Sequence, residues 1–247
     1  MQGSYDIVMM GHLSRDIIIF EGEEQRVTGG AVVYSAAAAV RSGAEVLAVT
    51  KCAAPDQGEL SLISDSGAEL RWIESEATTS IRNVYHTADR EQRTVTLISR
   101  AEPFTVDEIP DVETSIFHLA GLFVGELPDD LIRPAASRAA VALDVQGVLR
   151  TEIEGELLFR DWPAKKTYLP HVTYLKTDAA EAEIMTGTTD RRAAAEMLGS
   201  WGAREVMITH SSEVIVWTEG RIVSAPLTPR NLSGRTGRGD TCFAAYL

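Results

Sequence analysis

Residues 5–11 read YDIVMMG, residues 31–42 read AVVYSAAAAVRS, and residues 45–51 read EVLAVTK. The first and third stretches are short apolar runs rich in β-branched residues, as is typical of strands buried on both faces of a sheet. The stretch between them has the length and composition of a helix. This order predicts two parallel strands joined by a crossover helix.

The same alternation continues through most of the chain. Apolar runs predict further strands at 116–120, 140–145, 172–176 and 205–210. Helical patterns lie at 57–66, 129–138, 179–185 and 191–201. The sequence therefore predicts an α/β fold with a mainly parallel central sheet covered on both faces, and ligands at the carboxyl ends of its strands.

Two polar segments interrupt this alternation. Residues 17–28 and 80–100 have the period of half-exposed antiparallel strands, and the second turns at Ala88-Asp89-Arg90. We expect them to form a small β lid from about 13–29 and 71–100, within a single domain spanning 1–247. An apolar face on this lid would be compatible with a homodimer.

Composition limits the classes of partner. The chain has 247 residues, 45% hydrophobic and 24% charged, with 23 Lys+Arg against 36 Asp+Glu and a net charge of −13. This charge repels nucleic acid. No apolar run approaches the roughly 18 residues of a membrane span, and the N-terminus does not resemble a secretory signal. We expect no nucleic-acid or membrane partner and a cytoplasmic location.

The string Gly234-Arg-Thr-Gly-Arg-Gly-Asp240-Thr241 precedes an apolar helical segment. It has nearly the spacing of a P-loop, but Asp240 occupies the lysine position and reverses its charge. What remains is a glycine-rich turn at a helix N-terminus, where unpaired N–H groups form an anion site. A carboxylate beside such a site suits a general base for phosphoryl transfer. A simple Asp N-cap after a flexible turn is the alternative.

The string Gly237-Arg-Gly-Asp240 resembles the GAGD signature of the ribokinase-like, phosphofructokinase-B (PfkB) family of carbohydrate kinases. The resemblance implies a three-layer α/β sandwich with a β lid, and ATP and Mg²⁺ as cofactors. Asp240 would then be the catalytic base, with Gly237, Arg238 and Gly239 as the anion hole. Arg238 replaces the small residue usual in the family.

The resemblance also implies a substrate site for a small sugar or cyclitol. Asp16 would accept substrate hydroxyls, and Gly29 and Gly30 would let the backbone approach the ring. Tyr34 replaces the family's usual asparagine. The stretch from Asp144 to Arg150 is similar to an inositol-kinase subgroup, in which Gln146 and Arg150 would face the substrate. Each residue also has a simpler interpretation. Asp16 would be a solvated acid and the glycine pair a plain turn, whereas Gln146 would lie in a loop and Arg150 at the surface.

We expect the nucleotide-binding residues to follow the predicted strands at 172–176 and 205–210. Asp178 and Glu181 resemble the family's N-x-x-E segment, with Asp178 replacing its asparagine. The resemblance gives Glu181 an outer-shell role toward Mg²⁺, through water. The alternative is a capping box at a helix start, which is compatible with that role. Thr209 is a further nucleotide-binding candidate.

We therefore expect an ATP-dependent kinase acting on a hydroxyl of a small sugar or cyclitol. A ligand-binding or regulatory protein that keeps the kinase fold without turnover is the alternative, favoured by Arg238 and Tyr34. A dinucleotide-binding oxidoreductase is disfavoured because no G-x-G-x-x-G follows a strand. Family members continue beyond the position of Leu247 with helices that complete the adenine pocket, so the C-terminal end of the family fold is expected to be missing.

Overall fold

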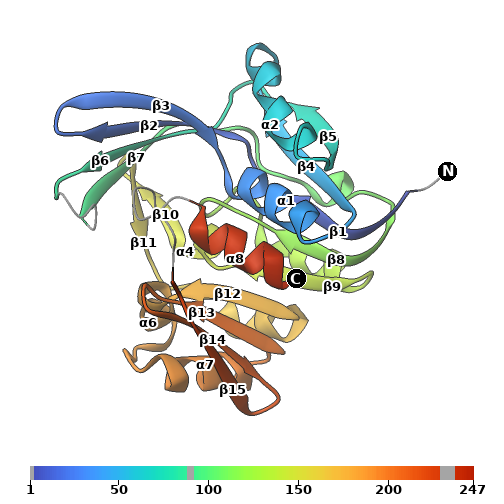
Figure 1. The fold of residues 1–247 in the computed structure, drawn as a ribbon, viewed down its shortest axis with the longest axis vertical. Helices are drawn as coiled ribbons and strands as arrows, with labels where there is room; N and C mark the ends of the chain where they lie inside the picture. Colours follow the sequence, from blue (N-terminus) through green and yellow to red (C-terminus); the bar gives the residue numbers. More distant parts are fainter. Residues whose placement is uncertain (1–2, 88–91, 229–236) are drawn as a thin grey trace.

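A nine-stranded sheet forms the centre of the computed structural model, which describes residues 3–87, 92–228 and 237–247 (Figure 1). From one edge to the other its strands are β15 (Arg221–Pro226), β14 (Glu213–Thr218), β13 (Glu205–Thr209), β12 (Tyr174–Asp178), β9 (Ala140–Asp144), β8 (Glu113–Leu119), β1 (Ser4–Met10), β4 (Val46–Cys52) and β5 (Glu69–Glu74). All neighbours pair in parallel except in the antiparallel run β13-β14-β15. The expected mainly parallel α/β class is confirmed, although the sequence analysis did not include the edge strands β14 and β15.

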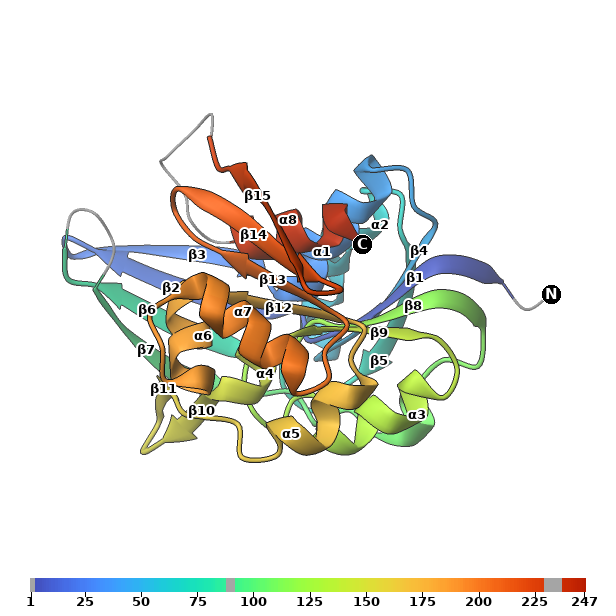
Figure 2. The same ribbon diagram turned by 90° about the horizontal axis from the view of Figure 1, so that it is seen from below.

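Helices cover both faces of this sheet, as Figure 2 shows. One face carries α1 (Ala31–Arg41), α2 (Ser61–Ser64) and α8 (Arg238–Tyr246), and the other carries α3 (Ile132–Ala136), α4 (Gln146–Leu149), α5 (Lys165–Tyr168), α6 (Ala179–Thr186) and α7 (Arg191–Ser200). Each face has its own apolar core, and Phe117 and Phe243 are among the largest fully buried side chains. Within the described residues, no helix combines the length and apolar composition needed to cross a membrane.

Two predicted helices are shorter than expected. The segment predicted as a helix at 57–66 is instead a 3₁₀ helix at Ala54–Leu60, which contains Gly58, followed by only four α-helical residues. Similarly, 129–138 divides into a 3₁₀ turn and the five-residue α3, which contains Pro134. Glycine and proline both weaken the α-helical hydrogen-bond ladder, which accounts for the short helices.

A second sheet of six strands extends from one end of the central sheet (Figure 1). Its order is β10 (Arg150–Ile153), β11 (Glu156–Phe159), β7 (Arg93–Ser99), β6 (Ser80–Tyr85), β2 (Ser14–Phe20) and β3 (Glu23–Gly29). The predicted lid range 71–100 began too early, because residues 71–74 pair with β4 in the central sheet. It also omitted β10 and β11, and β2 pairs with β6 in parallel rather than antiparallel. The predicted turn at Ala88-Asp89-Arg90 lies outside the described residues.

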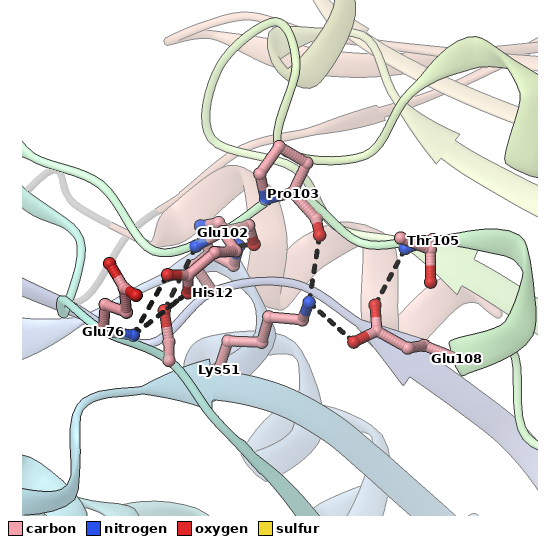
Figure 3. Close-up of polar contacts among 8 residues, drawn as sticks. His12, Lys51, Glu76, Glu102, Pro103, Thr105 and Glu108 are labelled. Atoms are coloured by element: carbon pink, nitrogen blue, oxygen red, sulfur yellow. Dashed lines mark hydrogen bonds and ion pairs between the residues drawn. The ribbon is translucent and has the colours of Figure 1, made fainter.

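Buried polar contacts hold the chain segments that enter and leave this second sheet (Figure 3). Lys51, at the end of β4, forms an ion pair with Glu108 at 2.7 Å and donates to the carbonyl of Pro103 at 2.9 Å. The imidazole of His12, just before β2, contacts the carbonyl of Glu102 through Nε2 at 3.1 Å. Burial lowers the pKa of His12 to about 3, so this ring is neutral. The contacts fix the approach to the second sheet.

Candidate active site

Charged residues meet where β9 and β12 end and α8 begins. Asp144 is the last residue of β9, and Lys176 lies in the neighbouring strand β12. Parallel pairing of these strands places Lys176 opposite Asp144. Asp240 lies in the first turn of α8. The carboxyl ends of adjacent parallel strands are the expected place for a ligand site in an α/β fold.

Lys176 and Asp144 form a buried ion pair. The Nζ of Lys176 lies 2.8 Å from Oδ2 of Asp144, and both side chains are less than a tenth exposed. Burial by itself lowers the pKa of Lys176, but Asp144, Glu181 and Asp240 together outweigh it and raise the pKa above its ordinary range. The ammonium therefore remains charged inside the protein.

The carboxyl of Asp240 has a pKa closer to neutrality than that of an ordinary aspartate. Burial raises the pKa of its carboxyl, and the nearby carboxylate of Asp144 raises it further. The cations Lys176 and Arg150 act in the opposite direction but do not cancel the shift. A base is most effective when its pKa lies near the working pH.

The turn before Asp240 is closely surrounded. Gly237 is the N-cap of α8 with a φ of 77°, and a Cβ there would lie 2.6 Å from Cγ of Tyr34. A Cβ at Gly239 would lie 3.1 Å from Nζ of Lys176. Arg238 is the first residue of α8 and is half-buried. Among the described residues no side chain caps α8, so its first N–H groups can bind an anion.

Asp16 lies in β2, and one oxygen of its carboxylate is unsatisfied. Oδ1 is buried without a hydrogen-bond partner in the described part of the chain, and burial raises the pKa of Asp16 to about 6, against the effect of Arg150. A cavity of about 430 Å³ includes Asp16 in its lining. A buried acceptor without a partner is the arrangement that a substrate hydroxyl would satisfy.

Tyr34 lies between the glycine pair at the end of β3 and the turn that begins α8. Burial raises the pKa of its phenol, and the carboxylates of Asp16 and Asp240 raise it further. Its hydroxyl lies 2.8 Å from the position of a Cβ at Gly29. Gly30 has a φ of 113°, and a Cβ there would collide with the carbonyl of His12. The glycine pair is therefore required by contacts within the protein.

Gln146 begins α4, and Arg150 follows its last residue. The guanidinium of Arg150 is buried, its Nε has no hydrogen-bond partner within the described ranges, and its Cζ lies 5.5 Å from the centre of the Phe159 ring. Burial lowers the pKa of Arg150 to about 10. Gln146 is half-buried, and its backbone N–H donates to Oδ1 of Asp144 at 3.1 Å. Asp144 thus connects the Lys176 side of the site to the start of α4.

Asp178 and Glu181 form the capping box of α6. Oδ1 of Asp178 accepts the N–H of Glu181, and Oε2 of Glu181 accepts the N–H of Asp178, each at 2.8 Å. Burial raises the pKa of Glu181, whereas Lys176 lowers it. Thr209 pairs with Asp178 across β12 and β13 and donates to the carbonyl of Thr177 at 3.4 Å. The capping box of Asp178 and Glu181 is the one that the alternative interpretation of the sequence anticipated.

The residues fit a magnesium ion that is carried mainly by a phosphate donor. In the described ranges, no group of three or more His, Cys, Asp and Glu side chains could hold a metal ion. Mg²⁺ usually takes one or two carboxylates, several waters and substrate phosphates. The capping box uses one of the two carboxylate oxygens of Glu181, which leaves the other for a water of the ion's hydration shell.

The sequence analysis did not assign Asp144, Lys176 or Glu126. A lysine within a buried strand is unusual and could have drawn attention to Lys176. The buried Glu126 accepts the N–H of His12 and that of Leu122, each at 2.7 Å, which ties the chain before β2 to the loop after β8. Nothing in the local sequence indicates these long-range contacts.

Residues 5–247 match the sequence model of the pfkB family carbohydrate kinases. The chain belongs to the pfkB family of carbohydrate kinases. It is 36% identical to a pyrophosphate-dependent kinase of the ribokinase family solved with a pyrophosphate analogue and myo-inositol, with a TM-score of 0.90 over 97% of this chain and 85% of that chain. The expected family, including its likeness to inositol kinases, is confirmed, as is a phosphotransferase activity on a sugar or cyclitol.

Two other pfkB-type kinases are more distant. A cytidine kinase of Thermococcus kodakarensis is 28% identical over 254 residues, covering 98% of this chain and 87% of that protein. Arabidopsis thaliana ribokinase, solved with ribose and ATP, has a TM-score of 0.74 at 18% identity, over 99% of this chain and 85% of that chain. The ribokinase structure supports the ribokinase-like fold.

Proposed function

We propose that this chain phosphorylates a hydroxyl of a cyclitol or small sugar with Asp240 as the general base. The observation that carries the proposal is the position of Asp240 in the first turn of α8, partly buried with a raised pKa beside the Lys176–Asp144 ion pair. A base there can take the proton of an attacking hydroxyl while the adjacent N–H groups face the developing phosphate charge.

The acceptor would bind between the second sheet and α8. Asp16 would accept a substrate hydroxyl, and Arg150 and Gln146 would donate to others. The unpartnered Oδ1 of Asp16 and Nε of Arg150 support this, because neighbouring hydroxyls of a polyol can satisfy an acceptor and a donor together. Tyr34 would pack against the ring. The myo-inositol in a similar kinase favours a cyclitol as the acceptor.

The second sheet would act as a lid. Asp16 belongs to β2 and Arg150 to β10, so two proposed substrate contacts come from this sheet. Strands carrying substrate contacts can exclude water from the reacting groups, which prevents water from competing as the acceptor.

The phosphate donor would lie at the start of α8. Gly237, Arg238 and Gly239 would form the anion hole, and Asp178 and Thr209 would lie toward a nucleotide. Mg²⁺, held through water by Glu181, would neutralise donor phosphate charge. ATP is the donor expected from family resemblance, and pyrophosphate is the second candidate because a similar kinase uses it. The close approach of the Lys176 ammonium to Gly239 supports a donor site at this turn, because the ammonium can contact a phosphate oxygen bound there.

Product formation with purified protein tests the proposal. Phosphorylation of myo-inositol, ribose and cytidine would be measured with ATP or pyrophosphate as donor, each with Mg²⁺. Asp240→Asn is expected to lower kcat by about 10²- to 10⁴-fold with the best pair. Asp107→Asn, at an exposed position, is the matched control and should retain full activity.

Two results would contradict the proposal. An Asp240→Asn variant with unchanged kcat would remove this residue from the mechanism. Polyol binding by calorimetry, without any turnover on the whole panel by the wild-type protein, would instead favour a ligand-binding protein that retains the kinase fold.

A further inference from the structure

The ammonium of Lys176 faces the turn that begins α8. A Cβ placed on Gly239 would lie 3.1 Å from both Cε and Nζ of Lys176. A side chain at position 239 would be a tight contact for the ammonium, which would have to shift to accommodate it. We propose that Lys176 is a ligand of the phosphate donor and contacts a non-bridging oxygen of the group being transferred. This inference rests on the proposed function.

The hydrogen bonds of Lys176 leave room for such a ligand. An ammonium group has three donors. Across residues 3–87, 92–228 and 237–247, the ammonium of Lys176 has one hydrogen bond, to Oδ2 of Asp144. Its side chain is 8% exposed, so water satisfies its remaining donors poorly. A phosphate oxygen at the start of α8 would complete them with a charge-assisted bond.

A second buried cation lies in the same site as Lys176. Lys176 and Arg150 are two buried cations, and no ion pair of Arg150 is present among the described residues. Asp144 is engaged with Lys176 and with the N–H of Gln146. A buried guanidinium without a partner is costly unless an anion or a polar ligand reaches it. A donor oxygen that reaches Lys176 or Arg150 would offset this cost.

Position distinguishes the roles of the two cations. Lys176 lies in the central sheet, two residues before Asp178 and against the α8 turn, which is the donor side of the proposed site. Arg150 begins β10 of the second sheet, which also carries Asp16, on the acceptor side. Lys176 should therefore affect donor affinity, and Arg150 acceptor affinity.

A different role for Lys176 would be to neutralise Asp144 and to tune Asp240. Without a donor contact, loss of the ammonium would move the acidic limb of the pH–rate profile upward, because Lys176 lowers the pKa of Asp240. Loss of the ammonium would then leave the affinity for the phosphate donor unchanged. The two roles therefore differ in a binding measurement that does not depend on turnover.

Isothermal titration calorimetry with methylenediphosphonate, a non-hydrolysable pyrophosphate analogue, tests the inference in the presence of Mg²⁺. Lys176→Met is expected to weaken diphosphonate binding by about 10- to 100-fold, the usual range for a lost bond to a charged group. Binding of myo-inositol should remain within about twofold of wild type. Lys166→Met, at an exposed position, is the matched control and should bind diphosphonate normally.

Two further variants keep the test informative if Lys176→Met folds poorly. Lys176→Met combined with Asp144→Asn removes the pair without leaving a buried charge. Gly239→Ala introduces a methyl group beside the ammonium at a helical position that tolerates alanine. Both should weaken diphosphonate binding by at least about tenfold.

Diphosphonate affinity that is unchanged in both Lys176 variants would overturn the inference, while turnover by the wild-type protein would leave the proposed function intact. Failure of the proposed function looks different. In that case the wild-type protein forms no phosphorylated product with any donor, and Asp240→Asn has no activity to lose.

Discussion

The ring of Tyr34 lies directly against Gly237. A Cβ at Gly237 would be 2.6 Å from Cγ of the ring, and the hydroxyl at the other end of the same side chain lies 2.8 Å from a Cβ position at Gly29. Tyr34 belongs to α1 and Gly237 caps α8, so one side chain connects the glycine pair near the N-terminus to the turn that carries the proposed base.

Gly237→Ala should therefore affect both stability and activity. Alanine at a φ of 77° is strained, and its methyl group would overlap Tyr34. We expect the free energy of unfolding to fall by about 1–3 kcal/mol and kcat to fall at least about tenfold, since small displacements of reacting groups are costly. Urea unfolding and steady-state kinetics measure the two effects.

A matched control separates strain from the Tyr34 contact. Gly43 also has a positive φ, 102°, but has open space around it. Gly43→Ala should reproduce the strain without changing kcat. Equal losses of activity in both variants would show that the contact with Tyr34 is irrelevant.

The pH dependence of the reaction should reveal Asp240. A general base acts when it is deprotonated, and burial together with Asp144 raises the pKa of this carboxyl. Activity should therefore decline as the pH falls through the raised pKa, well above the value of about 4 for an ordinary aspartate. A kcat profile recorded from pH 5 to 9 checks this. A flat profile down to pH 5 in a reaction limited by chemistry would contradict the assignment.

Asp16 should reduce stability at neutral pH. Its folded-state pKa of about 6 exceeds the ordinary value of 3.8, so the folded protein binds this proton more tightly than the unfolded chain. The cost is absent below about pH 4, develops between pH 4 and 6, and is complete above pH 6. Asp16→Asn should then increase the free energy of unfolding by about 2 kcal/mol at pH 7.5 and by much less at pH 4.5.

Chemical unfolding of both proteins at the two pH values provides the measurement. The same substitution should raise KM for the polyol, because an amide cannot replace both acceptor oxygens of the carboxylate. A gain in stability of equal size at both pH values would argue against ionisation of Asp16 as its cause.

Glu126 should control the acceptor side from a distance. Its two carboxylate oxygens accept the N–H groups of His12 and Leu122. Glu126→Gln replaces one acceptor with a donor that faces an N–H group. We expect the loss of about 1–3 kcal/mol of stability and a higher KM for the polyol with little change in donor KM. Glu113→Gln, at an exposed position, is the control, and an equal rise in both KM values would contradict a selective role.

Substitutions of the two members of the Lys51–Glu108 ion pair should lower the stability by unequal amounts. Lys51 is almost fully buried, whereas Glu108 is 23% exposed. Glu108→Gln leaves a buried ammonium without a counter-charge and should cost about 1–3 kcal/mol of unfolding free energy. Lys51→Met removes the buried charge and should cost less. The double variant should be more stable than the sum of the single effects predicts, which a double-mutant cycle in urea measures. Strictly additive effects would contradict the coupling.

The local sequence was sufficient to predict the alternating strands and helices and the glycine turn of the candidate site. Short β-branched runs such as 5–11 and 45–51 predicted the parallel strands, because burial on both faces requires continuous apolar residues. The glycine turn before Asp240 predicted the start of α8, since glycine at an N-terminus leaves N–H groups exposed. Helix lengths were less accurate where Gly58 and Pro134 weaken the hydrogen-bond ladder.

By itself, the sequence determined the α/β class and the family, and it indicated Asp16 and Asp240 as candidate site residues. Only the tertiary structure decided that β10 and β11 join the second sheet, and that Lys176 pairs with Asp144, 32 residues away. The physical reason is that strand order and sheet register bring these side chains together. Burial then sets their charge states, and neither register nor burial is a property of any local segment.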